Sequence, residues 1–377
     1  MEFGIFIQGY DPAFRRGNDP VKAEHDALMN ELEAVVAADK AGFKYVWITE
    51  HHFLDEYSHL SSNDVIAGWL AHATERIHIG SGIFNPLPQV NHPAKLAERV
   101  AMLDHLTGGR FEFGTGRGAG SHEILGFLHK DGITDTTATR EIWEDVIGEF
   151  AKMWMQDEYE GYEGKFWALP PRKILPKPYV KPHPAMWYAA GNQSSWEMCA
   201  LKGLGVLGFS VQDFEGLKPV LAAYKDAIPK ADPVGAFVND NIMITTSAYI
   251  AEDEETALRS FVDSRPMYLI SNVYRYHDTF PRPEGIPAWP DLIPDLDEAA
   301  AREMMAAGGS MFGTPDQVLE SCKKWADAGV DQLVFGIGPA TQEDTLETIR
   351  LIGKHIIPVL DKDPEFRTDK FKKAAAK

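Results

Sequence analysis

The chain has 377 residues, of which 44% are hydrophobic and 25% charged, which is ordinary for a globular protein with a large buried core. Asp and Glu outnumber Lys and Arg by 56 to 37, giving a formal net charge of -19. This acidic balance argues against a nucleic-acid-binding protein and against binding to an anionic membrane surface.

The sequence shows no sign of export or of membrane insertion. No stretch approaches the roughly 18 consecutive apolar residues of a membrane span. The first residues carry no basic segment or signal-type apolar core. The two cysteines, Cys199 and Cys322, support neither a disulfide framework nor a cysteine metal site. We therefore expect a cytoplasmic protein.

Short β-branched or aromatic runs alternate with longer amphipathic stretches along the chain. The predicted strands are Phe3–Ile7, Tyr45–Thr49, Ile77–Gly82, Phe111–Thr115, Ala185–Ala190, Val206–Phe209, Ile242–Ile250 and Asp331–Gly336. The predicted helices are Glu24–Ala41, Asn63–Thr74, His92–Leu106, Thr139–Met155, Ser194–Lys202 and Glu343–Leu360. Gly42 marks the end of the first helix, and Asn63 is the predicted N-cap of the second. The pattern predicts an α/β fold, a (β/α)8 TIM barrel in one domain over residues 1–377; an open doubly wound sheet is the alternative.

Two segments interrupt this alternation. Gly161–His183 is rich in Pro, Lys and aromatic residues, and we expect it to wrap the outside of the barrel. Ser264–Gly309 lies between the seventh and eighth predicted strands, and its middle, Phe280–Pro294, holds five prolines. Because long insertions in compact domains often serve the active site, we predict that Ser264–Gly309 is a lid.

The run from Thr49 to Phe53 directly follows the second predicted strand, where a barrel enzyme places catalytic groups. It contains His51 and His52, and imidazole can exchange a proton near neutral pH. Glu50 is expected to orient or tune His51, although neighbouring residues of an extended strand point to opposite faces, so His52 could instead pack away from the ligand or pair with Glu50. Either histidine could also be structural. No histidine and carboxylate set with zinc spacing is present, so we predict no metal, and we interpret the other histidines as surface or packing residues.

Two further loops could hold an anion. The glycine-rich run from Gly114 to Gly120 contains Arg117, which offers a planar fork of donors to a phosphate. It is not a Walker loop, and we predict no helix directly after it, so it also lacks dinucleotide-binding spacing. Asn192 and Ser195 open the helix after the fifth strand and would serve an anion site or a plain N-cap. A tight turn with a surface arginine is the alternative for the first loop.

Taken together, these motifs resemble those of the bacterial luciferase-like flavin-dependent monooxygenases. The resemblance covers nearly the whole chain and rests on the order and spacing of the motifs rather than on any one of them. The matching motifs are Glu50–Phe53, Asn91–Pro93, Gly108–Phe111, Gly114–Gly118, Gly313–Val318 and Ala328–Gln332.

The resemblance implies an enzyme that uses reduced FMN and molecular oxygen, with the flavin delivered by a separate reductase, and a homodimer. The catalytic histidine of the family falls on His51. The flavin-site residues fall on Arg117, Arg140, Gly191, Asn192 and Ser195, with a non-proline cis peptide at Gly82-Ile83. Gly116 replaces the reactive cysteine of luciferase, and Gly191 replaces a carboxylate. These two differences argue against light emission on aldehydes.

Two other activities stay open. The first is a deazaflavin-dependent oxidoreductase of the same superfamily, although the Glu50-His51-His52 motif favours FMN. The second is a non-catalytic flavin-binding protein, against which His51 and the long lid argue. We expect a small apolar organic substrate beside Tyr10, Tyr57 and Phe84, and both hydroxylation and Baeyer–Villiger oxygenation fit.

Overall fold

The computed structural model describes residues 1–13, 16–118, 120–209, 214–263, 268–277, 281–291, 293–294, 297–306, 311–337 and 341–376. Eight parallel strands close into a barrel in the order β1-β2-β3-β4-β7-β8-β9-β11, and β11 pairs with β1. They are β1 (Glu2–Ile7), β2 (Tyr45–Ile48), β3 (His78–Ser81), β4 (Phe111–Thr115), β7 (Met186–Ala190), β8 (Gly205–Phe209), β9 (Ile242–Ile250) and β11 (Gln332–Ile337). The predicted (β/α)8 barrel is confirmed, and the open sheet is wrong.

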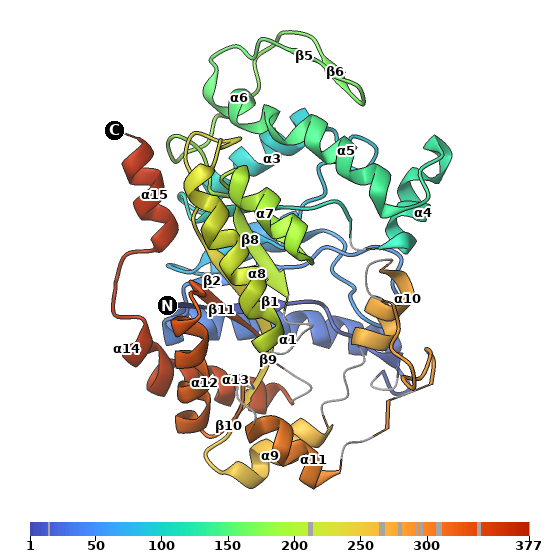
Figure 1. The fold of residues 1–377 in the computed structure, drawn as a ribbon, viewed down its shortest axis with the longest axis vertical. Helices are drawn as coiled ribbons and strands as arrows, with labels where there is room; N and C mark the ends of the chain where they lie inside the picture. The colour runs from blue at the N-terminus through green and yellow to red at the C-terminus, as the bar shows by residue number, and fades with distance from the viewer. Residues whose placement is uncertain are drawn as a thin grey trace.

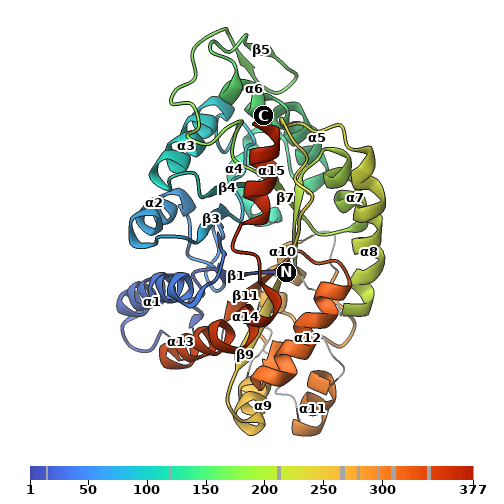
Figure 2. The same cartoon turned by 90° about the vertical axis from the view of Figure 1, so that its left-hand side faces the viewer.

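Helices surround the barrel, as Figure 2 shows along its axis. The ring consists of α1 (Pro20–Ala41), α2 (Asn63–Ala73), α3 (Pro93–Leu106), α5 (Thr136–Ile147), α6 (Glu149–Met155), α7 (Gln193–Leu201), α8 (Phe214–Ala227), α12 (Pro315–Asp327), α13 (Gln342–Leu351) and α14 (Ile357–Leu360). Gly42 ends α1 with φ 97°, as predicted. Asn63 is not the N-cap of α2, because Ser62 holds that position and the Asn63 amide instead donates to Ile48 O and Ile83 O.

The amino-terminal half of the barrel interior is filled by large side chains. Trp47 and Trp187 meet edge to face with their ring centroids 5.1 Å apart. Gly80 leaves the room they need, since a Cβ there would lie 2.3 Å from the Trp47 ring. The last helix, α15 (Arg367–Ala375), lies across this end of the barrel (Figure 2). In the described part of the chain, this packing fills the amino-terminal end and leaves room for a ligand at the opposite end, where the strands finish.

The segment Gly161–His183 lies outside the barrel, as predicted (Figure 1). It contains a small hairpin of β5 (Tyr162–Glu163) and β6 (Ala168–Leu169). The Tyr162 hydroxyl donates to Asp145 of α5 at 2.7 Å, which attaches the hairpin to the helical layer.

The insertion between β9 and β11 contains several short elements. α9 (Glu254–Asp263) precedes the predicted lid, and β10 (Met311–Gly313) follows it and pairs with β9. Of the predicted lid, residues 264–267, 278–280, 292, 295–296 and 307–309 lie outside the described residues. The described part includes a helical turn at Leu269–Val273, α10 (Tyr274–Tyr276) and α11 (Glu298–Ala306). In Figure 1, α10 lies beside α4 (Ser121–Leu128) near the strand ends.

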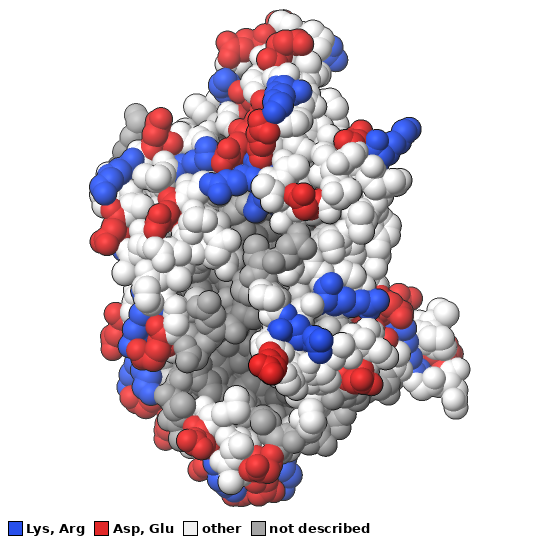
Figure 3. All heavy atoms as spheres, turned by 45° about the vertical axis from the view of Figure 1, so that its right-hand side comes forward, with Lys and Arg blue, Asp and Glu red and all other residues white. Residues whose placement is uncertain are grey.

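The distribution of charged side chains on the surface agrees with the acidic composition. Acidic and basic side chains are interspersed on the face seen in Figure 3, where no broad basic patch appears among the described residues. None of the described helices combines the length and the apolar character needed to cross a membrane.

Candidate functional site

A cavity of about 260 Å³ lies at the carboxyl ends of the barrel strands. It runs from the loop after β2, past β3 and β4, to the start of α7 and the ends of β8 and β9. Eight of the residues predicted from the sequence line it: His51, Tyr57, Gly82, Ile83, Arg117, Gly191, Asn192 and Ser195. The fold therefore brings most of the predicted site together in one place.

The floor of the cavity includes the peptide between Gly82 and Ile83, which is cis, as predicted. The Asn63 side chain donates to the carbonyl of Ile83 at 3.2 Å and so joins α2 to this floor. The side chains of Ile83, Leu207 and Met243 provide apolar wall around the middle of the cavity.

One end of the cavity is suited to an anion. The Arg117 guanidinium is fixed by donating to the Tyr188 hydroxyl and to Thr136 O, both at 2.7 Å. Asn192 and Ser195 form a reciprocal capping box at the start of α7, which confirms the N-cap prediction. The amino-terminal amides of α7 and the Arg117 charge thus lie at the same end of the cavity.

Three predicted site residues lie elsewhere. Arg140 is half exposed on α5, pairs with Glu144 at 3.2 Å and is absent from the described lining, so its flavin role stays a prediction. Tyr10 does not line the cavity but lies behind Tyr57, with ring centroids 6.5 Å apart. Phe84 is wholly buried among core side chains outside the barrel. The prediction for Phe84 is wrong because neighbouring residues of extended backbone face opposite sides, and Ile83 takes the cavity side.

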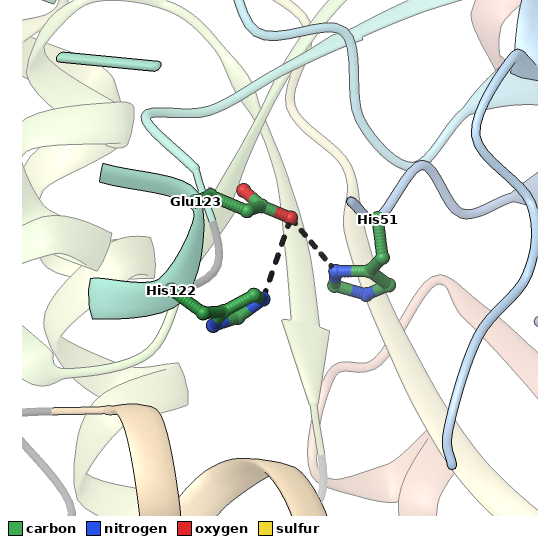
Figure 4. Close-up of side chains that lie close together, drawn as sticks. All are labelled: His51, His122 and Glu123. Atoms are coloured by element: carbon green, nitrogen blue, oxygen red, sulfur yellow. Dashed lines mark hydrogen bonds and ion pairs between the residues drawn. The ribbon is translucent and has the colours of Figure 1, made fainter. Parts of the chain in front are cut away.

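At the other end of the cavity, the partner of His51 is Glu123. The Nδ1 atom of His51 lies 3.2 Å from Glu123 Oε1, and both side chains are buried (Figure 4). The backbone amide of His52 donates to the same oxygen at 3.4 Å. Of the two roles predicted for Glu50, pairing with His52 is confirmed at 3.5 Å, and this contact raises the pKa of His52. The carboxylate beside His51 is Glu123 instead of Glu50.

Sequence reasoning missed α4, the helix that carries Glu123. We predicted no helix directly after the glycine-rich loop, yet α4 begins at Ser121. The apolar residues of Ser121–Leu128 were a weak signal, since the helix has only eight residues and includes a glycine. Only the closed barrel shows that its first turn points at the loop after β2.

His122 is also part of this cluster. Its ring packs against Tyr276 of α10 at 4.4 Å between centroids, and burial lowers its pKa to about 4. Its Nε2 atom lies 3.8 Å from Glu123 Oε1. Donor atoms of His51, His122 and Glu123 all lie within 4.8 Å of one another, a set that could hold a metal ion. The prediction of no metal relied on spacing along the chain, and this cluster joins two distant segments.

The His51 end is more polar than we expected from the sequence. Glu50, His52, Asn85 and Glu123 line it together with aromatic rings. The small apolar substrate stays a prediction, and a ligand at this end would also meet hydrogen-bonding groups.

Comparison with known proteins assigns the chain to a family. Residues 1–332 match the family described as luciferase-like monooxygenase. The chain is 27% identical to the flavin-dependent trigonelline monooxygenase oxygenase component of Acinetobacter baylyi, over 89% of each chain. It is likewise 27% identical to the alkanal monooxygenase alpha chain of Photorhabdus laumondii, over 96% of this chain and 98% of the other.

Solved structures share the fold. Monooxygenase RslO1 from Streptomyces bottropensis superposes with a TM-score of 0.76 at 22% identity, over 95% of this chain and 99% of its own. The oxygenating constituent of 3,6-diketocamphane monooxygenase from Pseudomonas putida, solved with FMN, gives 0.73 at 19% identity, over 95% and 98%. The chain belongs to the luciferase-like monooxygenase family and is a flavin-dependent monooxygenase.

Proposed function

We propose that the protein is the oxygenase component of a two-component monooxygenase that uses reduced FMN and O₂. One oxygen atom enters a small organic substrate, the other leaves as water, and reduced FMN supplies two electrons. The observation that carries this proposal is that one cavity has Arg117 and the start of α7 at one end and a buried His–Glu pair at the other. A relative named as an oxygenase component supports a separate flavin reductase as partner.

The described residues fit FMN. Arg117 and the start of α7, with Asn192 and Ser195, would hold the phosphate. Ile83, Leu207 and Met243 would contact the flat ring, and the glycines at 82 and 191 leave space along the cavity. When bound, reduced FMN supplies the electrons and activates oxygen. The protein positions both reactants and excludes water.

A deazaflavin is the alternative cofactor, since an F420-dependent secondary alcohol dehydrogenase shares the fold with a TM-score of 0.67 at 15% identity. That cofactor has a long acidic tail, which calls for several basic residues. Arg117 is the only Lys or Arg among the described residues that line the cavity. This single positive charge favours the shorter FMN.

His51 is the proposed catalytic residue. It lines the cavity, and its Nε2 atom is the ring nitrogen that does not face Glu123. At that atom it can accept or return a proton during oxygen transfer. We expect His51→Ala to lower product formation by about 10²–10⁴-fold, while FMN affinity and melting temperature change little. Normal turnover with excess reduced FMN, or failure only because the variant unfolds, would contradict this assignment.

The described residues 268–277 support the proposed lid. Tyr268, Val273 and His277 line the cavity, and Tyr276 packs on His122. We propose that this insertion keeps bulk water from the site. Deleting Phe280–Pro294 should leave the barrel folded but release more hydrogen peroxide per substrate oxygenated. Unchanged coupling in that variant would remove the lid role.

We also propose a homodimer through the early helices. Val65 and Trp69 on α2, and Met102 and Leu106 on α3, are exposed apolar side chains on two helices that pack side by side. Such a surface is stabilised by covering it. We expect sedimentation to show a dimer in the wild type and a monomer for Trp69→Lys.

A further inference from the structure

We infer that Glu123 is the positioning residue of His51, and that the pair acts as a base toward an acidic O–H group on an aromatic substrate. This inference rests on the proposed function and adds to it a substrate class and a preference for hydroxylation.

Glu123 determines which nitrogen of His51 can act. Its carboxylate lies 3.2 Å from Nδ1, and both groups are shielded from water. A carboxylate at that distance keeps a proton on Nδ1 and leaves the lone pair on Nε2. It also stabilises the imidazolium that forms when Nε2 takes a proton. The two residues come from the loop after β2 and from α4, so the barrel itself sets their distance.

Most of the other titratable groups around His51 are engaged with other side chains or stay protonated. His52 is engaged with Glu50 at 3.5 Å. The ring of His122 is covered by Tyr276, with ring centroids 4.4 Å apart. Burial also raises the pKa of the Tyr57 and Tyr268 hydroxyls, so both stay protonated. His277 lines the cavity from the insertion. His51 is therefore the proposed base: its Nδ1 atom faces the Glu123 carboxylate, and its side chain lines the cavity.

Aromatic rings form the wall beside this base. The Tyr57 ring meets His51 edge to face at 5.4 Å between centroids. Tyr268 packs at 4.3 Å from Tyr57 and at 5.1 Å from Phe209. Three adjoining rings favour a flat aromatic substrate, since offset and edge contacts between rings add to simple burial. An aliphatic aldehyde offers neither a ring for this wall nor an acidic proton for the base.

The chemistry follows from these two features. The substrate O–H gives its proton to His51 Nε2, and the resulting oxyanion makes the ring carbons electron-rich. When bound, reduced FMN would supply the activated oxygen; a ring carbon of this oxyanion would take up one oxygen atom as the O–O bond breaks, and it would lose its hydrogen as a proton. The second oxygen atom leaves as water. The two electrons come from reduced FMN, which becomes oxidised.

The test needs no flavin. The probe is para-nitrophenol, whose anion absorbs visible light, titrated with pH on the isolated protein. We expect binding to the wild type to lower the pH midpoint for ionisation of the probe by about one unit. Glu123→Gln should abolish that shift, and Glu123→Asp should restore part of it. The ¹⁵N shifts of the His51 ring should show the proton on Nδ1 in the wild type and a mixture of tautomers in Glu123→Gln.

The chain offers a matched control. Glu24 forms a second Glu–His contact, 2.6 Å from His59 Nδ1, and neither residue belongs to the described cavity lining. Glu24→Gln should leave the probe midpoint unchanged. An equal midpoint for wild type and Glu123→Gln, with both variants folded by their melting curves, would overturn the positioning role. An equal loss of the midpoint shift in Glu24→Gln would also overturn the positioning role.

The substrate class has its own outcome. If the wild type binds decanal but neither para-nitrophenol nor other phenols, the aromatic assignment is wrong. Because these measurements use no cofactor, failure of the FMN proposal would appear separately, as weak binding of reduced FMN to a protein that still ionises the probe.

Discussion

Thr368, nine residues from the end of the chain, donates a hydrogen bond of 2.7 Å to Glu112 at the bottom of the barrel. Both side chains are fully buried. Glu112 also accepts from Trp187 Nε1 at 2.8 Å and lies 2.8 Å from His78 Nδ1. The last helix thus supplies a polar partner to a carboxylate that would otherwise be buried without enough donors.

We predict that Thr368→Val lowers the free energy of unfolding by roughly 1.5–3 kcal/mol, because a hydrogen bond to a buried charged group is lost. Chemical denaturation measures this. Lys373→Gln, which removes an exposed ion pair on the same helix, should stay within about 0.5 kcal/mol of the wild type. Equal effects for the two variants would contradict a role of α15 in closing the barrel.

The barrel was predictable because its strands are short, nearly continuous apolar runs, so the predicted and observed limits differ by a residue or so. Helix α15 was not predictable, because Arg367–Ala375 is strongly polar. Its buried residues, Thr368 and Lys372, contact side chains that are far away in the sequence. Glu123 was missed for a related reason. The Glu–His pair exists only after the barrel joins α4 to the loop after β2, and local pattern favoured the adjacent Glu50.

Either Arg117 or Arg140 could hold the FMN phosphate, and substituting each of them tests which one does. Arg117 lines the cavity, whereas Arg140 is half exposed and is absent from the described lining. We expect Arg117→Ala to weaken binding of reduced FMN by about ten- to a hundredfold, as loss of a charge-assisted hydrogen bond implies. Arg140→Ala should weaken it less. Anaerobic titration of both variants measures this, and unchanged affinity in Arg117→Ala would exclude the assignment.

His52 should make stability depend on pH. Its pKa in the folded protein is raised above 6.5, chiefly by the hydrogen bond to Glu50. A raised histidine pKa stabilises the fold at pH below the unfolded value, and this contribution disappears as the pH rises through the folded value. His52→Gln should therefore cost more stability at about pH 5.5 than at about pH 9. Melting curves at both pH values test the sign, and a larger loss at high pH would contradict it.

The cluster of His51, His122 and Glu123 predicts how the enzyme responds to metal ions. Zinc bonds of about 2.0–2.2 Å in tetrahedral geometry place neighbouring ligand atoms roughly 3.4 Å apart. The nitrogen atoms of His51 and His122 lie 3.2 and 3.8 Å from the same Glu123 oxygen, so small shifts would admit zinc. A bound ion would engage the proposed base. We expect added Zn²⁺ to inhibit oxygenation, EDTA to restore activity, and EDTA alone to leave it unchanged.

His122→Phe keeps an aromatic ring against Tyr276 but removes one ligand, and it should raise the zinc concentration for half-inhibition by about tenfold or more. Inhibition that is equal in both proteins would show that zinc binds elsewhere, and loss of activity in EDTA alone would show that a metal takes part in the reaction.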